Sequence, residues 1–535
     1  MPIDFIQVFK RATMDVGHYK GFKILLVTPE VTFLPRTEDK SLQVTGARAG
    51  GLADISACLV HSLNDLQMDV HVAVPYYRNA FQKNTISSGS VEGHRRYERL
   101  PTSSVHLARD RSFFYQPKLS GLPIWENVKI SLAFQREVIN RIIPEVQPDL
   151  IHCFDWMTGL IPAMTRQFEI PCLFTLYNMA SAKVTLAAVE EQGIDAASFW
   201  QNCYFTQMPG SYEETRESNP VDFLMSAIFA AHFVNTVSTT FCQRLLKEDL
   251  PGIEPALRRE LWHKSESGCL SAIDHGPDPS YNPANDRFLF RRYTPKDQHA
   301  GKTFNKLHLQ ERLSLPLDSR APLFFWPTRL DKIRAGCRLI VETLPTLLER
   351  FATFNPQIVF IADGDFQQGL RDLVNAMHAG DHVAVTDFDA RLRRLAYAAA
   401  DFVLLPVAND PCGLPCKIGQ RYGALPVVYH TTAIQSTISH MDCSQNQGNG
   451  FVFNNLDAGG ILWVLEQCMA FHRKPMDLKA LQLERIMTES VDRYNYSETI
   501  AQYIALYESM LQRKFRHDGS QGMASKRDDM AQRAA

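Results

Sequence analysis

The sequence of 535 residues has no excess of charge of either sign: 56 Lys and Arg face 58 Asp and Glu, so the formal net charge is −2. A protein whose main partner is nucleic acid needs a basic surface, and this balance gives no support for that class of function. The chain also lacks an unbroken apolar run of about 18 residues, so we expect no transmembrane helix. Residues 1–21 carry charges where a signal peptide needs a continuous apolar core.

Patterns typical of disulfide frameworks and metal sites are missing too. The eleven cysteines are an odd number, and several lie in apolar runs typical of strands. This suits reduced thiols in a cytoplasmic protein better than a disulfide framework. Cys412 and Cys416 are the only close pair, and no second Cys/His pair with zinc-finger spacing follows them. We expect no metal and no cofactor.

Short apolar runs alternate with longer amphipathic ones, in two series along the chain. The first series of predicted strands covers residues 22–28, 70–75, 149–156, 171–178 and 232–238. The second series covers residues 322–330, 357–365, 382–388, 401–407, 425–430 and 450–453. Between the first two strands, Ile55, Leu59 and Leu63 recur at helical spacing and predict a helix over residues 53–66. Strands that alternate with helices in this way indicate parallel sheets covered by helices on both faces.

A chain of this length is too long for one hydrophobic core. We predict an α/β protein of two doubly wound, Rossmann-like domains that face a cleft, with domain bounds at residues 1–267 and 268–495. Residues 268–288, rich in Pro, Asp and Asn, read as the connection between them. A last amphipathic helix over 496–515 is expected to pack back on the first domain, followed by a disordered tail over 516–535.

In open α/β sheets, ligands bind at the carboxyl ends of strands, so the loops that follow the strands are candidate sites. "GARAGGLADIS" (residues 46–56) places Gly50 and Gly51 before a helix, where the backbone can come close to a ligand. Asp54 lies in the first turn of that helix, and Arg48 could reach an anionic group. A glycine pair in this position is also typical of an ordinary tight turn. Asp155 follows a strand as well, where a plain helix cap is the alternative.

Two loops of the second series are suited to phosphate. "TRLDKIRAG" (residues 328–336) brings Arg329, Lys332 and Arg334 close together, either as a solvated charged run or as a clamp on a diphosphate. Further on, Cys412 and Gly413 lie at a helix start, where backbone N–H groups can hold an anion. Together these loops could bind a diphosphate without a metal ion.

At these loops the chain resembles the family of bacterial glycogen synthases and plant starch synthases. The likeness runs from about Phe22 to Leu511 and keeps the family's order of motifs, of which we identify six: "RAGGLADI", "DLIHCFDWMTGL", "NTVSTTF", "TRLDKIRAG", "DPCGL" and "RYGALPVV". The resemblance implies a two-domain GT-B fold. It implies transfer of glucose from ADP-glucose or UDP-glucose to the non-reducing end of an α-1,4-glucan, with retention of configuration and without a metal.

Carried over by position, the resemblance also implies roles for individual residues. Arg329 and Arg334 form the phosphate clamp, and Cys412, Gly413 and Leu414 present backbone donors to the donor's phosphates. Asp410 takes the place of a glutamate that holds sugar hydroxyls, and Phe388 falls where an aromatic ring stacks on the base. Asp155 and Asn178 line the sugar site, while Arg48, Gly50, Gly51 and Asp54 lie near the donor.

Several positions depart from the family pattern. Tyr177 takes the place of a histidine near the transferred sugar, and Met225 that of a lysine. Arg48 replaces a lysine and Met157 replaces a histidine. Ser271, which the resemblance places on the sugar or acceptor side, begins "SAID" where the family has N-G-I-D. These changes leave two alternatives open: a degenerate homologue that binds glucan or nucleotide without turnover, or a transferase with another donor or acceptor. The oligomeric state is open as well.

Overall fold

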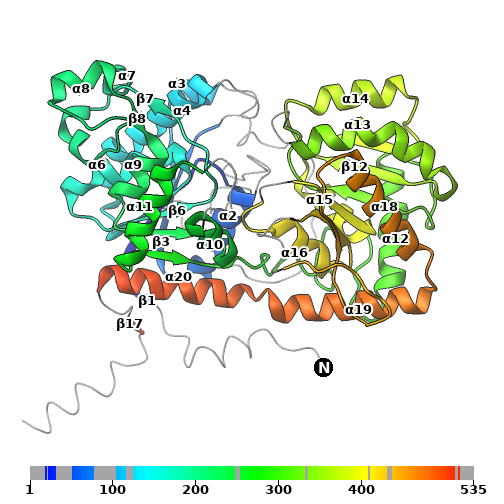
Figure 1. Ribbon diagram of the computed structural model, residues 1–535. Helices are drawn as coiled ribbons and strands as arrows, with labels where there is room; N and C mark the ends of the chain where they lie inside the picture. The colour runs from blue at the N-terminus through cyan, green and yellow to red at the C-terminus, as the bar shows by residue number, and fades with distance from the viewer. Residues whose placement is uncertain are drawn as a thin grey trace, which may run out of the picture.

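The computed structural model describes residues 19–20, 22–31, 51–77, 104–115, 124–247, 253–331, 335–407, 410–430, 437–512 and 516–517. Within them the chain forms two lobes, each built around a sheet with helices about it (Figure 1). The prediction of an α/β fold with two doubly wound domains is confirmed.

The first sheet has seven strands, all parallel to their neighbours, in the order β10-β9-β6-β5-β2-β3-β4. Its strands are β2 (Lys23–Val27), β3 (Asp69–Pro75), β4 (Val105–Ala108), β5 (Leu150–Phe154), β6 (Cys172–Leu176), β9 (Phe233–Thr236) and β10 (Leu270–Ala272). The helices of this lobe are α2 (Gly51–Asp65), α3 (Arg111–Phe114), α4 (Ile124–Glu137), α5 (Ile143–Val146), α6 (Ile161–Thr165), α7 (Leu186–Glu191), α8 (Tyr212–Ser218), α9 (Phe223–Ala230), α10 (Thr239–Lys247) and α11 (Pro255–Glu266). Every residue of β5 and β6 is buried, as expected for central strands covered on both faces.

The second sheet has six parallel strands in the order β13-β12-β11-β14-β15-β16. They are β11 (Leu323–Trp326), β12 (Gln357–Ile361), β13 (Val383–Thr386), β14 (Phe402–Leu405), β15 (Leu425–Tyr429) and β16 (Phe451–Phe453). The helices are α12 (Gln298–Arg312), α13 (Ala335–Arg350), α14 (Gln367–Ala376), α15 (Ala390–Ala399), α16 (Leu414–Arg421), α18 (Ala458–His472) and α19 (Met476–Arg493). Two short antiparallel pairs, β7 (Lys183–Val184) with β8 (Val221–Asp222) and β1 (Tyr19–Lys20) with β17 (Arg516–His517), lie outside the main sheets.

In both sheets, the side on which the chain adds its next strand changes at one point. From β2 the chain adds β3 and β4 on one side and then returns to add β5 on the other; β11 and β14 are related in the same way. Ligands in doubly wound folds bind outside the carboxyl ends of the strands at such a switch point. The loops after β2, β5, β11 and β14 are therefore the best placed to form a site.

The chain ends by returning to the first lobe. Helix α20 (Tyr496–Leu511) runs beneath that lobe in Figure 1 and buries the rings of Tyr503 and Tyr507. The Tyr507 hydroxyl lies 2.8 Å from His152 Nδ1 on β5, and Asn235 of β9 donates to the Tyr503 hydroxyl at 3.2 Å. These contacts fix α20 to the first sheet.

Two sequence-based bounds differ from the structure. The first sheet includes β10, which pairs with β9, so it reaches past residue 267, where we had placed the domain boundary. Within the tail that we expected to be disordered, Arg516 and His517 pair with β1, while residues 518–535 lie outside the described residues.

Candidate functional site

The residues predicted to form a site follow strands at the carboxyl edges of both sheets. Asp155 comes directly after β5, Tyr177 and Asn178 after β6, Arg329 after β11, and Asp410 after β14. The two edges meet across the molecule. The Ser238 hydroxyl, beyond β9, donates to the carbonyl of Pro411 at 2.6 Å. The loops at the two carboxyl edges, where we predicted a cleft, are therefore in contact.

Asp155 and Asn178 lie together, as their predicted role in one sugar site requires. Asn178 Nδ2 donates to Asp155 Oδ2 at 3.1 Å, while Asp155 Oδ1 accepts from the N–H of Met157 at 3.1 Å. The Asp155 backbone has φ 70° and ψ 157°, a region that is almost restricted to glycine. The fold maintains this strain at the point where the carboxylate leaves β5, which is typical of functional residues. The simple helix-cap alternative explains the bond to Met157 but not this backbone conformation.

Tyr177 reaches from the end of β6 to the start of α2. A methyl group built on Gly51 would overlap the Tyr177 hydroxyl, and the ring carbon that bears the hydroxyl would be 3.2 Å away. The tyrosine hydroxyl packs against the backbone of Gly51, so a larger residue at this position would have to displace the Tyr177 ring. The substituted tyrosine therefore fills space beside the helix start that we predicted to lie near the donor.

Arg329 and Thr328 contain polar atoms that are buried without a partner. Arg329 Nη2 lies 3.2 Å from Asp331 Oδ1, but Arg329 Nε and Thr328 Oγ1 have no hydrogen-bond partner among the described residues. The loop is fixed to the loop that follows β12, since the N–H of Leu330 donates to the carbonyl of Asp363 at 3.0 Å. Unsatisfied buried donors in a native fold need an explanation, and an anionic ligand is one.

The loop before α16 differs from our prediction. Asp410 Oδ1 accepts from the N–H of Cys412 at 3.2 Å and from the N–H of Gly413 at 2.9 Å. Two of the three amides that we expected to be open to phosphate are therefore bonded to this carboxylate, because the short aspartate side chain closes an Asx turn on the amides that follow it. Gly413 has φ 64°, a left-handed conformation suited to glycine, and the space around its α-carbon is open. Leu414, whose N–H we also predicted as a donor, is the first residue of α16.

Phe388 and Asp54 are linked by a residue that sequence reasoning missed. The guanidinium of Arg393, on α15, lies 5.1 Å from the centre of the Phe388 ring, the predicted base-stacking surface. Arg393 Nη2 also lies 3.0 and 3.1 Å from the two carboxylate oxygens of Asp54, in the other lobe. Asp54 therefore forms an ion pair across the cleft. Sequence spacing offers no signal for this, because the partners are 339 positions apart.

The remaining predicted residues fall into two groups. Ser271 lies within β10, at the edge of the first sheet, and its buried hydroxyl has no hydrogen-bond partner among the described residues. No described contact joins it to Asp155 or Asn178, so its place on the sugar side stays a prediction. Met157 and Met225 are both buried in the core of the first lobe. Arg48, Gly50, Lys332 and Arg334 lie outside the described residues.

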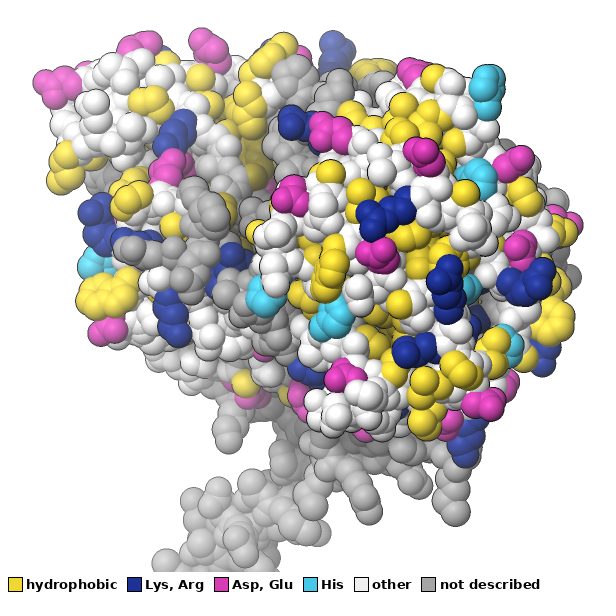
Figure 2. Space-filling view, turned by 45° about the vertical axis from the view of Figure 1, so that its right-hand side comes forward, with side chains coloured by type: hydrophobic (Ala, Val, Ile, Leu, Met, Phe, Trp, Pro, Cys, Tyr) yellow, Lys and Arg dark blue, Asp and Glu magenta, His cyan; other side chains and the backbone are white. Residues whose placement is uncertain are grey.

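The cysteines, the candidate metal ligands and the longest helices of the described residues bear on the expectations drawn from composition. All eleven cysteines are free thiols, and burial raises the pKa of Cys412 to about 11. No group of three or more His, Cys, Asp or Glu side chains in the described ranges could hold a metal ion. Nor is any described helix long and apolar enough to cross a membrane. On the face seen in Figure 2, acidic and basic side chains are interspersed over the second lobe.

Comparison with known proteins agrees with this geometry. Residues 23–259 match the family described as "Starch synthase catalytic domain". The chain is 28% identical to a glycogen synthase of Geotalea daltonii over 92% of its own length and all of that protein, and 29% identical to a glycogen synthase of Cellvibrio japonicus over 86% and 96%. The catalytic domain of starch synthase IV from Arabidopsis thaliana, solved with ADP and acarbose, has a TM-score of 0.72 at 22% identity and covers 92% of this chain and 100% of that one.

A more distant structural likeness supports the same fold. Sucrose-phosphate synthase from Thermosynechococcus elongatus has a TM-score of 0.56 at 18% identity and covers 92% of this chain and 100% of that one. Motifs that follow the strands in the family's order, two doubly wound domains and relatives matched over nearly their whole length all agree. The family match over residues 23–259 and the glycogen synthases matched over most of their length confirm the predicted resemblance to glycogen and starch synthases.

Proposed function

We propose that this protein transfers glucose from ADP-glucose or UDP-glucose to the non-reducing end of an α-1,4-glucan, with retention of configuration. The observation that carries the proposal is the pair of buried, unpartnered polar atoms Arg329 Nε and Thr328 Oγ1, which lie after β11 at the switch point of the second sheet. A nucleotide sugar's diphosphate would supply the anionic acceptors that these atoms lack. Relatives named glycogen synthases, aligned over most of the chain, support the same reaction.

The main catalytic task is to stabilise charge on the departing diphosphate. As the bond between the hexose and the diphosphate breaks, negative charge grows on the phosphate oxygens. A preorganised cation aimed at that charge stabilises the transition state more than the ground state. We assign this role to Arg329, assisted by Arg334 outside the described residues. A metal ion is then not required, because guanidinium groups provide the positive charge.

On the sugar side, Asp155 and Asn178 would hold hydroxyl groups of the transferred glucose. Their mutual hydrogen bond orients both groups and limits their motion, which favours one bound geometry. Asp410 keeps one carboxylate oxygen, Oδ2, without a hydrogen bond among the described residues, and we assign that oxygen to another sugar hydroxyl. The free thiols fit a reducing compartment, and we propose a cytoplasmic location.

The proposal is tested by incubating the protein with ADP-glucose or UDP-glucose and a maltooligosaccharide primer. Nucleotide release together with chain growth on one donor supports it. Glucan binding without nucleotide release would identify a degenerate homologue instead. Donor hydrolysis without primer extension would point to another acceptor.

The clamp role of Arg329 has its own test. Arg329→Ala should lower turnover about 10²–10³-fold, because a preorganised contact to the developing charge is lost. The matched control is Arg338→Ala, on the exposed face of α13, where the arginine pairs only with Glu342 one helical turn away among the described residues. Equal rates for the Arg329 variant and the unmodified protein would contradict the assignment.

A further inference from the structure

Arg393 is an arginine of the second lobe whose guanidinium is buried at the junction of the two lobes. Only 5% of the residue is exposed. It projects from α15, and its one carboxylate partner among the described residues is Asp54 on α2. In Figure 1, α2 lies between the lobes, on the side that α15 and α16 face. The contact therefore joins the start of a helix in one lobe to a helix in the other.

The same guanidinium also binds the connection between the lobes. Arg393 Nη2 donates to the Tyr281 hydroxyl at 2.5 Å, and Tyr281 belongs to the irregular segment that follows β10. The centre of the Phe388 ring also lies 5.1 Å from the guanidinium carbon, close enough for a cation–π interaction. One side chain thus contacts the first lobe, the connection and the predicted base-stacking ring.

The energetics of this ion pair depend on whether the lobes are together. When they are closed, both charges are out of water and each depends on the other. When they part, water reaches both groups, so a buried pair alone is close to neutral for closure. Removing one partner changes this balance. The remaining charge then loses this counter-ion in the closed form only, so the balance shifts toward the open form.

We propose that Arg393 is a positioning residue that compensates the charge of Asp54 at the junction and thereby allows the lobes to close, which brings the sugar-side and phosphate-side groups of the cleft together. Asp155 and Gly51 lie in the first lobe, whereas Arg329 and Phe388 lie in the second. These groups can act on one nucleotide sugar only when the lobes are closed. The apparent affinity for a nucleotide is the intrinsic affinity reduced by the fraction of closed molecules.

The first experiment measures closure in the protein without any ligand, so that it does not depend on the proposed reaction. Fluorophores are attached at Ser218→Cys on α8 and Asn375→Cys on α14, exposed positions in opposite lobes, and their distance is followed by energy transfer. The two partly exposed native thiols, Cys269 and Cys443, are first replaced by serine. Arg393→Met should increase the mean distance between the lobes.

Two further variants separate an interdomain role from general stabilisation. Arg394→Met is the matched control: this neighbour on α15 is buried as well, but it binds Asp286 and Ser280 of the connection rather than the first lobe. It should leave the distance unchanged. Asp54→Asn combined with Arg393→Met removes both charges and should restore part of the closure that Arg393→Met loses.

The second experiment measures binding of ADP and UDP by calorimetry. Arg393→Met should weaken binding of the preferred nucleotide about 10-fold or more, and the double variant should recover part of that loss. The proposal is overturned if Arg393→Met leaves the distance unchanged, if Arg394→Met opens the lobes equally, or if the double variant is as open as Arg393→Met. An opened Arg393→Met variant in a protein that never transfers glucose would refute the proposed reaction and leave the closure role intact.

Discussion

The hydroxyl of Tyr177 lies against the backbone of Gly51, at the first residue of α2. Tyr177 stands where the family has a histidine. Its hydroxyl occupies the space that a methyl group on Gly51 would need. Each residue therefore limits what the other can become. This dependence can be tested without knowledge of the substrate, because it is steric.

Gly51→Ala should lower stability and activity, since the new methyl group must displace the Tyr177 ring or shift α2. In the double variant Gly51→Ala with Tyr177→Phe, the overlapping oxygen is gone and the nearest ring carbon is 3.2 Å away. We expect the double variant to recover at least half of the loss in thermal midpoint. Thermal melts of the two single variants and the double variant provide the measurement. If Tyr177→Phe adds its own loss to that of Gly51→Ala, the steric account is wrong.

At Asp410 the local sequence predicts the turn, whereas our assignment of the amides in that turn to phosphate differs from the structure. The spacing Asp-Pro-Cys-Gly predicts a tight turn before a helix, and the structure has that turn. An aspartate at its start bonds the amides two and three residues on, a local preference that is legible in sequence. We instead assigned those amides to phosphate from the family pattern, in which the residue is one methylene longer. The shorter side chain changes which group occupies the amides.

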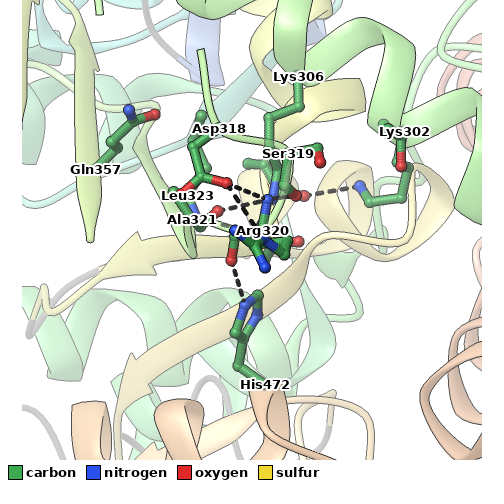
Figure 3. Close-up of polar contacts among 12 residues, drawn as sticks. Lys302, Lys306, Asp318, Ser319, Arg320, Ala321, Leu323, Gln357 and His472 are labelled. Atoms are coloured by element: carbon green, nitrogen blue, oxygen red, sulfur yellow. Dashed lines mark hydrogen bonds and ion pairs between the residues drawn. The ribbon is translucent and has the colours of Figure 1, made fainter. Parts of the chain in front are cut away.

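At the scale of elements, one lysine fixes two helices that lead to the site. Lys302 on α12 is buried, and its Nζ donates to the carbonyls of Ala398, Ala400 and Tyr422 at 3.2, 2.7 and 3.0 Å. These carbonyls lie at the C-terminal ends of α15 and α16, where a helix leaves carbonyls without an intrahelical partner, and burial lowers the pKa of Lys302 to about 7. Figure 3 shows Lys302 beside Lys306, which lies one turn further along α12 and pairs with Asp401 at 2.6 Å.

Lys302→Met keeps most of the side-chain volume but removes all three donors. We expect a loss of about 1–3 kcal/mol, mainly at the carbonyl of Ala400, because the Tyr293 hydroxyl also donates to the carbonyls of Tyr422 and Ala398 at 2.8 and 3.5 Å. The lost anchor of α15 and α16 should also weaken nucleotide binding, because Phe388 precedes one helix and Gly413 the other. Urea unfolding followed by circular dichroism measures the stability. The control is Arg312→Met, an exposed position on the same helix, and equal unfolding of both variants would contradict the anchoring role.

The central strands could be predicted because their own residues form short, mostly apolar runs. "LIHCF" and "FVLL" are short, fully buried apolar runs, and they form β5 and β14 as predicted. The strands that the sequence did not reveal, β4 and β10, contain four and three residues at the two edges of the first sheet. Such short edge strands depend on their neighbour for hydrogen bonds, so their own residues carry little periodic signal.

At the scale of the whole molecule, the contacts that assemble the cleft join distant parts of the chain. Arg393 meets Asp54, and Lys417 donates to the carbonyl of His275 at 2.7 Å. In sequence, Arg393 belongs to a charged run, "RLRR", which reads as a solvated helix face. Tertiary packing buries it instead. The loops of the site could be predicted one by one, whereas the pairs between them could not.

Buried histidines at the junction of α20 with the first lobe give the molecule a defined response to acid. His275 bonds the Tyr503 hydroxyl through Nε2 at 3.0 Å; burial, together with the nearby Lys417 ammonium, lowers its pKa to about 3. Burial also lowers the pKa of His61 to about 4 and holds that of His152 well below its usual value. In the unfolded chain these imidazoles titrate near pH 6.5. Below that pH the unfolded state binds protons that the folded state does not.

The stability that these histidines contribute should therefore be complete above about pH 6.5 and fall as the pH is lowered toward 4, with a slope of about 1.4 kcal/mol per pH unit for each such histidine. His275→Gln keeps a group able to bond Tyr503 but cannot titrate, so its stability should decrease less steeply with acid than that of the unmodified protein. Urea unfolding at pH 7.5, 6.5, 5.5 and 4.5 measures the two slopes. His299→Gln, at an exposed position on α12, is the control and should leave the slope unchanged. Parallel curves for His275→Gln and the unmodified protein would show that protonation of this imidazole does not limit the stability of the fold in acid.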